Sequence, residues 1–452
     1  MSNGSSAGWH GHWRRALMTG LVAGLFGGCF FGDETEGLPC TSNDGCDLGL
    51  ECAFGYCRFE DVDTTATCGD GETKQGEFCH SDASSTTLGT MGGALRDLAI
   101  VDFDGDGLTD ILTVSEGAFV HVNDGNGGFV PMPIEISLDL EDLEIEVPDT
   151  AALRIVGRRV GVGQLEGTEL PDLVLAVDVE AEVEGPVVDA VIEELEELLW
   201  LGENLGNNEL ELRPLLGTEP YGDVALAERG LLVGNFDGGG ELDVVVVTEP
   251  LDAPSQGVFM EGGGDTLGVP VEVMLGGRGT TVAIDVDGDG LDDLVTADPV
   301  FEQVSVVRGP LGGLPPPMAE SFSVGGAAGG VTGTDADGDG NLDLVVTITG
   351  VGFEVWMGDG TGAFTAGWTV EDAAVESMVA ADLDGDGNQD LASVTGTELR
   401  VHPGYGDGTF SAGFTLSSSG GGFIFAAPLD SDGVDELVFG NPASLSVAFS
   451  RP

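Results

Sequence analysis

Residues 102–110 read Asp-Phe-Asp-Gly-Asp-Gly-Leu-Thr-Asp, and the same DxDGDGxxD pattern occurs at 285–293, 335–343 and 382–390. An apolar run precedes each copy, and a second apolar run starts directly after its last Asp, as at residues 111–113. Short apolar runs on both sides of a Gly-rich loop are typical of β-strands. We therefore expect strand-loop-strand units that recur along the chain.

The acidic loops also predict metal sites. Calcium takes about six to eight oxygen ligands, and carboxylates at loop positions 1, 3 and 5 can turn toward one ion. Position 9 would complete the cage, position 7 could add its backbone carbonyl, and Gly at positions 4 and 6 allows positive φ angles. Magnesium, which keeps its waters, fits such a cage less well. About four calcium sites are expected, with ligands Asp102, Asp104, Asp106, Asp110, Asp285, Asp287, Asp289, Asp293, Asp335, Asp337, Asp339, Asp343, Asp382, Asp384, Asp386 and Asp390.

An EF-hand is the main alternative for an acidic loop of this kind. It requires Glu at position 12 and a helix on each side of the loop. Position 12 holds Thr113, Thr296, Val346 and Ser393, and the flanking runs, such as residues 344–347, are rich in β-branched residues. The sequence therefore excludes the EF-hand on both tests.

Three degenerate copies become visible when the strand after position 9 is used to align the units. Their positions 1, 3, 5 and 9 hold Gln164, Glu166, Thr168 and Asp172; Asn235, Asp237, Gly239 and Asp243; and Pro428, Asp430, Asp432 and Glu436. Consecutive ninth positions lie 46 to 71 residues apart. Seven such units predict an all-β fold, a seven-bladed β-propeller of four-stranded antiparallel blades. Whether the three degenerate loops bind metal stays open.

The chain resembles the FG-GAP/VCBS repeat propellers, a family that includes the head of integrin α subunits. The resemblance rests on the DxDGDGxxD loops and on a downstream Gly-rich turn that ends in Phe, found at residues 123–129, 358–364 and 404–410. It spans roughly residues 80–452. It implies that each loop joins the first two strands of a blade and holds a calcium ion on one face of the disc.

The two ends of the propeller should meet in one blade. The seventh unit has room for three strands, at about 423–429, 436–440 and 444–449, before the sequence ends. We expect a strand from residues 78–92 to supply the fourth, which would close the ring and remove an exposed edge. An acidic insertion at about 187–197 in the second unit could form one short amphipathic helix.

The first 28 residues read as a signal peptide. Arg14 and Arg15 precede an apolar run too short to span a bilayer permanently. The run ends in Leu25-Phe26-Gly27-Gly28-Cys29, which resembles the lipobox of bacterial lipoproteins and implies lipidation of Cys29, with residues 29–39 as a tether. The expected location is the bacterial outer membrane or cell surface, with membrane contact through the anchor alone. An ordinary secretory signal is the alternative.

Six further Cys lie within 40 residues. In an exported chain they predict a small disulfide module over residues 40–79, whose connectivity has 15 possibilities. Zinc is disfavoured because the CxxC spacing is absent. Residues 68–71 and 76–79 resemble a disulfide repeat of secreted bacterial proteins. The Cys assigned to disulfides are Cys40, Cys46, Cys52, Cys57, Cys68 and Cys79.

Charge and motif content narrow the function. A formal charge of −66, from 80 acidic and 14 basic residues, disfavours nucleic acid as a partner. GxSxG, HExxH and phosphate-loop motifs are absent from the sequence. We expect a non-enzymatic recognition or adhesion module for a surface protein or glycan. The alternatives are a structural envelope component and a calcium-dependent polysaccharide lyase or hydrolase, for which Arg154, Arg158 and Arg159 form the only dense basic group.

Large side chains recur at one place on the third strand of several units. The spacing predicts that Trp200 and Trp356 share this position with His121, Met260 and His402. Packing between blades is the expected role of these residues.

Overall fold

The structure is a computed structural model, and it describes part of the chain. The described residues are 50–53, 56–59, 73–75, 78–80, 86–88, 93–115, 117–125, 127–138, 153–163, 170–181, 199–206, 208–215, 226–239, 242–248, 255–263, 267–313, 315–371, 375–395, 397–417, 421–430 and 434–449. The predicted signal peptide, the tether with Cys29, and the predicted helix at 187–197 lie outside them, as do Cys40, Cys46 and Cys68. Cys52, Cys57 and Cys79 lie in strands described by their backbone alone, so the disulfides stay predictions.

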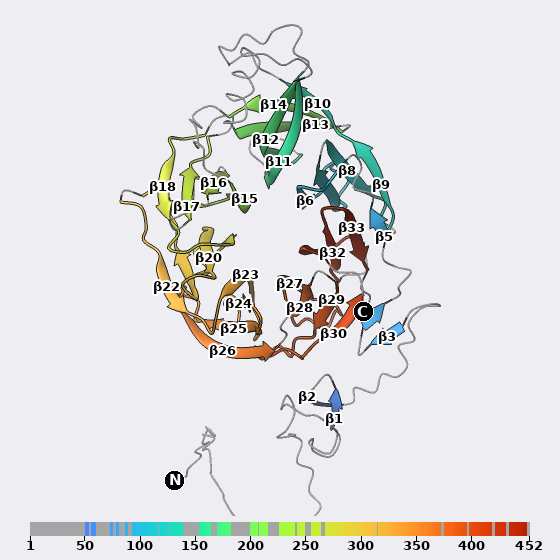
Figure 1. Cartoon of the computed structure of the whole chain (residues 1–452), viewed down its shortest axis with the longest axis vertical. Helices are drawn as coiled ribbons and strands as arrows, with labels where there is room; N and C mark the ends of the chain where they lie inside the picture. Colours follow the sequence, from blue (N-terminus) through green and yellow to red (C-terminus); the bar gives the residue numbers. More distant parts are fainter. Residues whose placement is uncertain are drawn as a thin grey trace, which may run out of the picture.

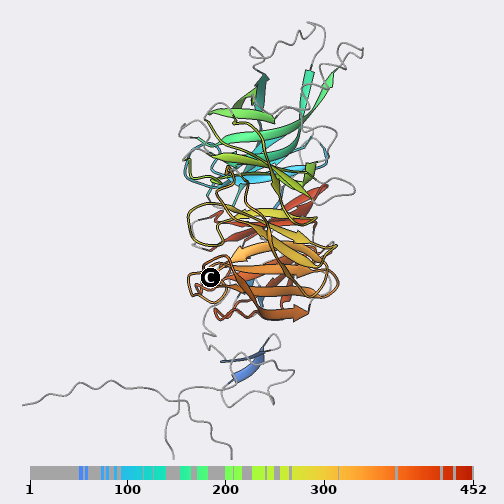
Figure 2. The same ribbon diagram turned by 90° about the vertical axis from the view of Figure 1, so that its left-hand side faces the viewer.

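Seven sheets surround a central axis, and their strands pair antiparallel except for one pair in blade 2. The ring that they form is a disc when seen edge-on (Figures 1 and 2). The predicted seven-bladed, all-β propeller is thus confirmed. In five of the blades, the four strands follow one another in sequence order from the inside of the ring to its rim. Blade 1 contains β6 (Asp97–Val101), β7 (Asp110–Val114), β8 (Ala118–Asn123) and β9 (Phe129–Pro133), and blade 3 contains β15 (Leu226–Gly234), β16 (Asp243–Thr248), β17 (Gln256–Met260) and β18 (Val271–Met274).

Blades 4 to 6 repeat this order. They contain β19 (Thr281–Ile284), β20 (Asp293–Asp298), β21 (Gln303–Val307) and β22 (Glu320–Ser323); β23 (Ala328–Thr334), β24 (Asp343–Ile348), β25 (Gly352–Gly358) and β26 (Phe364–Glu371); and β27 (Ser377–Ala381), β28 (Asp390–Val394), β29 (Leu399–His402) and β30 (Phe414–Ser417). First strands of neighbouring blades contact one another around the axis.

Blade 2 departs from the expected four strands. It contains β11 (Leu153–Gly163), β12 (Asp172–Ala181), β13 (Leu199–Gly206) and β14 (Glu209–Pro214), and β10 (Glu135–Leu138) adds a fifth, pairing in parallel with β14. The segment that forms β9 continues past Ile134 directly into β10. The outer strand of blade 1 therefore also covers the outer edge of blade 2.

Blade 7 joins the two ends of the ring. Its strands are β31 (Phe423–Ala427), β32 (Glu436–Asn441), β33 (Ser444–Ala448) and β5 (Thr86–Leu88). The short strand β5, which lies within the segment from which the closing strand was expected, pairs antiparallel with β33. Leu88 is buried together with Leu98 of blade 1 and Val447 of blade 7, so the closure also contributes to the core.

The core lies between neighbouring blades. The second strand of each blade has apolar side chains on both of its faces, and β16, β20 and β24 are buried along their whole length. Val245 of blade 3, for example, belongs to one buried cluster with Leu294 of blade 4. Because each blade buries both of its faces against its neighbours, the ring is one cooperative packing unit rather than seven separate sheets.

The alignment of Trp200 with Trp356 was wrong. The first residue after position 9 faces His121, Met260, Trp356 and His402 in blades 1, 3, 5 and 6, whereas in blade 2 it faces Gly202. Trp200 lies two residues before Gly202 in the same strand and faces Leu175. A shift of two keeps a side chain on the same face of a sheet, so Trp200 is still fully buried in the packing role expected of it.

Two short hairpins precede the ring. They are formed by β1 (Leu50–Ala53) with β2 (Tyr56–Phe59) and by β3 (Thr73–Gln75) with β4 (Phe78–His80). The β1–β2 hairpin lies outside the ring in both views (Figures 1 and 2). Within the described residues, no helix has the length and apolar character needed to cross a bilayer.

Candidate metal centres

The four complete acidic loops occupy equivalent places in blades 1, 4, 5 and 6. Each connects the end of a first strand to the start of a second strand, and in all seven blades the second strand begins at position 9. Since the first strands run alike around the axis, the loops lie together on one face of the disc. We call this face, which carries residues 102–110, 285–293, 335–343 and 382–390, the loop face.

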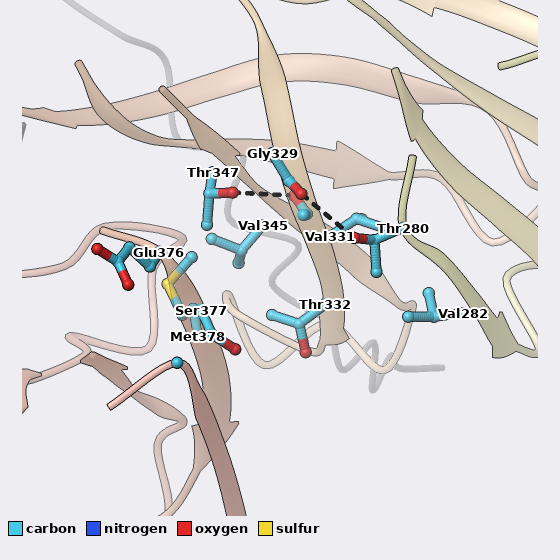
Figure 3. Close-up of a pocket in the computed structure, with 12 residues that line it drawn as sticks. Thr280, Val282, Gly329, Val331, Thr332, Val345, Thr347, Glu376, Ser377 and Met378 are labelled. Carbon is cyan, nitrogen blue, oxygen red and sulfur yellow. Dashed lines mark hydrogen bonds between the residues drawn. The ribbon is translucent and has the colours of Figure 1, made fainter. Parts of the chain in front are cut away.

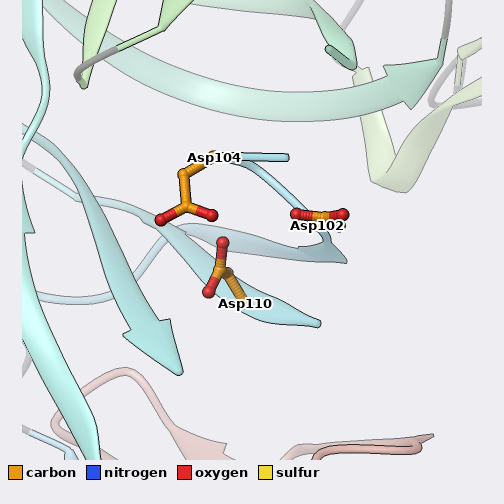
Figure 4. A group of neighbouring side chains, drawn as sticks. All are labelled: Asp102, Asp104 and Asp110. Atoms are coloured by element: carbon orange, nitrogen blue, oxygen red, sulfur yellow. The ribbon is translucent and has the colours of Figure 1, made fainter. Parts of the chain in front are cut away.

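Three carboxylates converge in every complete loop. One oxygen from each of the three lies within 4.8 Å of the others. In the first loop the carboxylates of Asp102, Asp104 and Asp110 turn toward a common space (Figure 4). The other groups are Asp285, Asp287 and Asp289; Asp335, Asp337 and Asp339; and Asp382, Asp384 and Asp390. The groups leave out Asp106, Asp293, Asp343 and Asp386, so the structure brings together three of the four predicted ligands of each loop.

The carboxylate at position 1 organises its loop through the backbone. Asp102 accepts hydrogen bonds from the N–H groups of Gly105 and Gly107, at 2.8 and 3.0 Å. These glycines have φ angles of 77° and 90°, in the left-handed region that residues with a Cβ avoid. A Cβ on Gly107 would meet no atom within 4 Å, so the backbone angle rather than crowding explains this Gly. The loop is thus shaped so that its side chains gather on one side.

The carboxylate at position 9 has a second, structural role that the sequence analysis missed. Asp390 accepts one hydrogen bond from Leu383 at position 2, at 3.0 Å, and another from Gly404 after the third strand, at 2.9 Å. Asp110 accepts the equivalent bonds from Phe103 and Asn123, at 3.0 and 2.8 Å. The same pair of bonds is made by Asp293 and Asp343. Each position 9 carboxylate therefore ties its loop to the third strand while facing the other acids.

Burial strongly disfavours the charge at position 9. It raises the pKa of Asp110 and Asp293 to about 6 and that of Asp390 to about 8, and the charges of neighbouring loop carboxylates act in the same direction. The hydrogen bonds from the backbone oppose this rise without cancelling it. A buried carboxylate held beside other carboxylates is a donor set that a divalent cation would neutralise, so the loops fit the predicted calcium.

Among the described residues, the degenerate loop of blade 3 keeps the hydrogen bonds of position 9 without a group of three converging carboxylates. Asp243 is buried and accepts hydrogen bonds from Phe236 and Gly262, at 2.9 and 2.8 Å. Asn235 replaces the acid at position 1, and its amide donates to the Gly290 carbonyl at 2.9 Å. Residues 164–169 of blade 2 and 431–433 of blade 7 lie outside the described residues. Position 9 thus stays acidic even where a group of three carboxylates is not formed.

The metal-free protein should lose stability as the pH rises from about 7 to about 9. Over this range folded Asp390, with a pKa of about 8, releases a proton that the unfolded chain has already lost. The free energy of unfolding should therefore fall by about 1 kcal/mol across the range. Urea denaturation in calcium-free buffer measures this. Asp390→Asn should abolish this fall in the free energy of unfolding with pH, and Asp386→Asn should keep it. An equal pH dependence in the two variants would contradict the assignment to Asp390.

Part of the chain matches the model of a known repeat family. Residues 285–346, 335–393 and 382–439 match the FG-GAP-like repeat. This chain carries FG-GAP-like repeats. The matches include the loops of blades 4, 5 and 6, whereas the loop of blade 1 lies outside them. No curated protein matches the sequence.

Several solved structures are similar to the chain at low identity. A lectin of Agrocybe aegerita, whose structure concerns recognition of non-reducing terminal N-acetylglucosamine, is 18% identical over 72% of this chain and 81% of its own, with a TM-score of 0.48. The BBS1N–ARL6DN complex is 11% identical over 83% of this chain and 98% of its own, with a TM-score of 0.49. The rhamnogalacturonan lyase YesW is 14% identical over 80% of this chain and 74% of its own, with a TM-score of 0.44.

Proposed function

We propose that this chain is a calcium-stabilised propeller that recognises a surface protein or glycan, exported and held at the bacterial envelope by lipid on Cys29. One observation carries the proposal. Four clusters, each of three converging carboxylates, lie in the loops on one face of the disc. Calcium bound there would order the loops and neutralise acidic charge that otherwise opposes the compact state. The ions would act as structural fasteners, and the other face would be free for a ligand.

The described histidines support binding rather than catalysis. His121 and His402 are buried, and their imidazoles lie 3.3 Å and 3.1 Å from the hydroxyls of Thr113 and Ser393. Burial lowers the pKa of both rings to about 4, so they are neutral at physiological pH. Side chains enclosed in this way pack between blades and do not reach a substrate, which supports a recognition module.

A binding screen tests this function. The purified chain, with calcium, should bind at least one member of an array of bacterial surface glycans and envelope proteins. Excess EDTA should abolish that binding and calcium re-addition should restore it, because the loops order the blade edges. Absence of any bound member would contradict the proposal and favour a structural envelope component.

Two measurements extend the same test. Cleavage products in the glycan wells, detected by mass spectrometry, would contradict a non-enzymatic role and favour the lyase or hydrolase.

In cells, Cys29→Ala should move the protein from the membrane fraction to the soluble exported fraction. An unchanged distribution would contradict lipidation at Cys29.

A further inference from the structure

The face of the disc opposite the loops carries a group of arginines. We call this the opposite face; it contains the connections that lead into the first strands, such as those before β6 and β11. Arg96, Arg158, Arg159 and Asp178 surround a cavity of about 240 Å³ there. With 14 basic residues against 80 acidic ones in the chain, three arginines around one cavity with a single carboxylate form a local excess of positive charge.

Arg159 lacks an acidic partner in the part of the chain that the structure describes. Asp178 pairs with both Arg96 and Arg158, the latter with Nε and Oδ1 3.3 Å apart. Arg159 instead donates through Nη1 to the backbone carbonyls of Arg158, at 2.8 Å, and of Arg96, at 3.4 Å. Its Nε is buried without a hydrogen-bond acceptor. Because Arg159 lines the cavity and has no acidic partner among the described residues, its guanidinium can bind an incoming carboxylate by a charge-assisted hydrogen bond.

An apolar cavity adjoins the arginines. Arg96 and Arg159 line it as well, and it has a volume of about 130 Å³. Phe423 and Phe425, whose ring centroids are 6.3 Å apart, lie on the blade 7 side. The rest of its lining comes from Leu95, Leu98, Gly422 and Pro442, and from Asp97, which also accepts a hydrogen bond from the Val160 N–H. Aromatic rings beside a guanidinium suit a ligand that presents both a C–H face and a negative charge.

A third, polar cavity continues around the axis. Gly422 lines both this cavity and the apolar one, so the two adjoin. Its volume is about 180 Å³, its hydroxyl groups come from Thr280, Thr332, Thr347 and Ser377, and Glu376 adds one carboxylate to the lining (Figure 3). Thr280 and Thr347 donate only long bonds to Gly329 and Gly330, of 3.3 and 3.4 Å. Such hydroxyls can exchange these bonds for bonds to the hydroxyls of a ligand.

We infer that the opposite face binds an acidic glycan, with a uronate carboxylate on Arg159, a sugar ring against Phe423 and Phe425, and sugar hydroxyls in the cavity around Thr347. The inference rests on the proposed recognition function and names its ligand class. An acidic peptide would also satisfy the arginines, but it does not need the hydroxyl-lined cavity. The combination of guanidinium, aromatic rings and hydroxyls therefore favours the glycan.

The large negative charge of the chain does not prevent this contact. Screening reduces long-range repulsion beyond about 8 Å at physiological ionic strength, so the residues that line the cavities set the local charge. The three arginines surround one cavity with Asp178, whereas Asp97 and Glu376 lie in the lining of the two cavities that follow. The four acidic loops lie on the other face of the disc, and bound calcium would neutralise part of their charge. We therefore expect the affinity to be set by Arg159 and its neighbours rather than by the net charge.

Calorimetric titration of the full, calcium-loaded chain tests the inference. At about 0.15 M ionic strength it should bind tetragalacturonate and should not bind the fully methyl-esterified tetrasaccharide, which keeps the hydroxyls and lacks the charge. Arg159→Gln should weaken binding by at least about tenfold, and Arg159→Lys by less, because Lys keeps the charge without the planar pair of donors. Arg308→Gln is the matched control: Arg308 pairs with Glu320 and donates to Thr361 on the loop face, and its loss should leave binding unchanged.

Three results would overturn the inference. They are equal binding of the methyl ester, unchanged binding by an Arg159→Gln variant with an unaltered melting temperature, and equally tight binding of an oligoglutamate peptide. If the array yields a calcium-dependent protein or neutral glycan while uronates fail, this inference is wrong and the proposed function stands.

Discussion

Replacing Asp390 by Ala should destabilise the metal-free protein by about 2–4 kcal/mol, because two buried backbone N–H groups lose their acceptor and each unsatisfied group costs about 1–3 kcal/mol. These are the N–H groups of Leu383 and Gly404, which connect the loop of blade 6 to the end of its third strand. Removal of the desolvated carboxyl group offsets part of the loss. Urea denaturation in calcium-free buffer below pH 7, where Asp390 with its pKa of about 8 is protonated, measures the difference.

Asp386→Ala is the matched control for this prediction. Asp386 lies in the same loop, is exposed, and accepts hydrogen bonds from Asn388 alone, at 2.7 and 2.9 Å. Its loss should change the metal-free free energy of unfolding by less than about 1 kcal/mol, as is usual for surface positions. Similar losses for the two variants would show that position 9 is not a structural tie and acts through metal alone.

The backbone hydrogen bonds accepted by the acid at position 9 explain why the repeats could be counted from the sequence. In every blade the second strand begins at this residue, and an acid is kept there even in the degenerate loops that end at Asp172, Asp243 and Glu436. In blades 1, 3, 4, 5 and 6 the acid accepts two backbone hydrogen bonds whether or not three carboxylates converge in the loop. Its partners could not be predicted, because they are backbone N–H groups supplied by residues as different as Asn123 and Gly404.

Contacts between distant segments were the part of the structure that the sequence did not reveal. The pairing of β10 with β14 depends on how blades 1 and 2 lie side by side, and neither strand carries a local signal for it. The place of Arg96 could not be predicted for the same reason. Arg96 lies far from Arg158 in the sequence, and the two share Asp178 only because blades 1 and 2 are neighbours in the ring. The closing strand β5 could be expected because the count of strands left one place unfilled, which is an argument from the whole ring rather than from residues 86–88.

Removing calcium should produce the largest change in stability. If the four sites bind in the extracellular range of about 10⁻⁴ to 10⁻³ M, about 10 mM calcium exceeds the dissociation constant by about tenfold to a hundredfold. Each site then contributes about 1.4–2.7 kcal/mol. Sites in different blades should add approximately, to about 6–11 kcal/mol, so excess EDTA should lower the melting temperature of a ring of this size by about 7–14 °C. Scanning calorimetry in calcium, in magnesium and in EDTA measures this, and magnesium should restore little of the loss.

A variant that lacks one site provides the internal control. Asp382→Asn combined with Asp384→Asn removes two of the three converging carboxylates in blade 6 and keeps Asp390 and its backbone bonds. In calcium this variant should lose about a quarter of the stabilisation, since independent sites contribute additively. In EDTA it should melt at or above the temperature of the unaltered chain, because two like charges beside the buried Asp390 are gone. An unaltered chain that melts at the same temperature in calcium and in EDTA would exclude the ions as fasteners, because ligands that bind only the folded state must raise its stability.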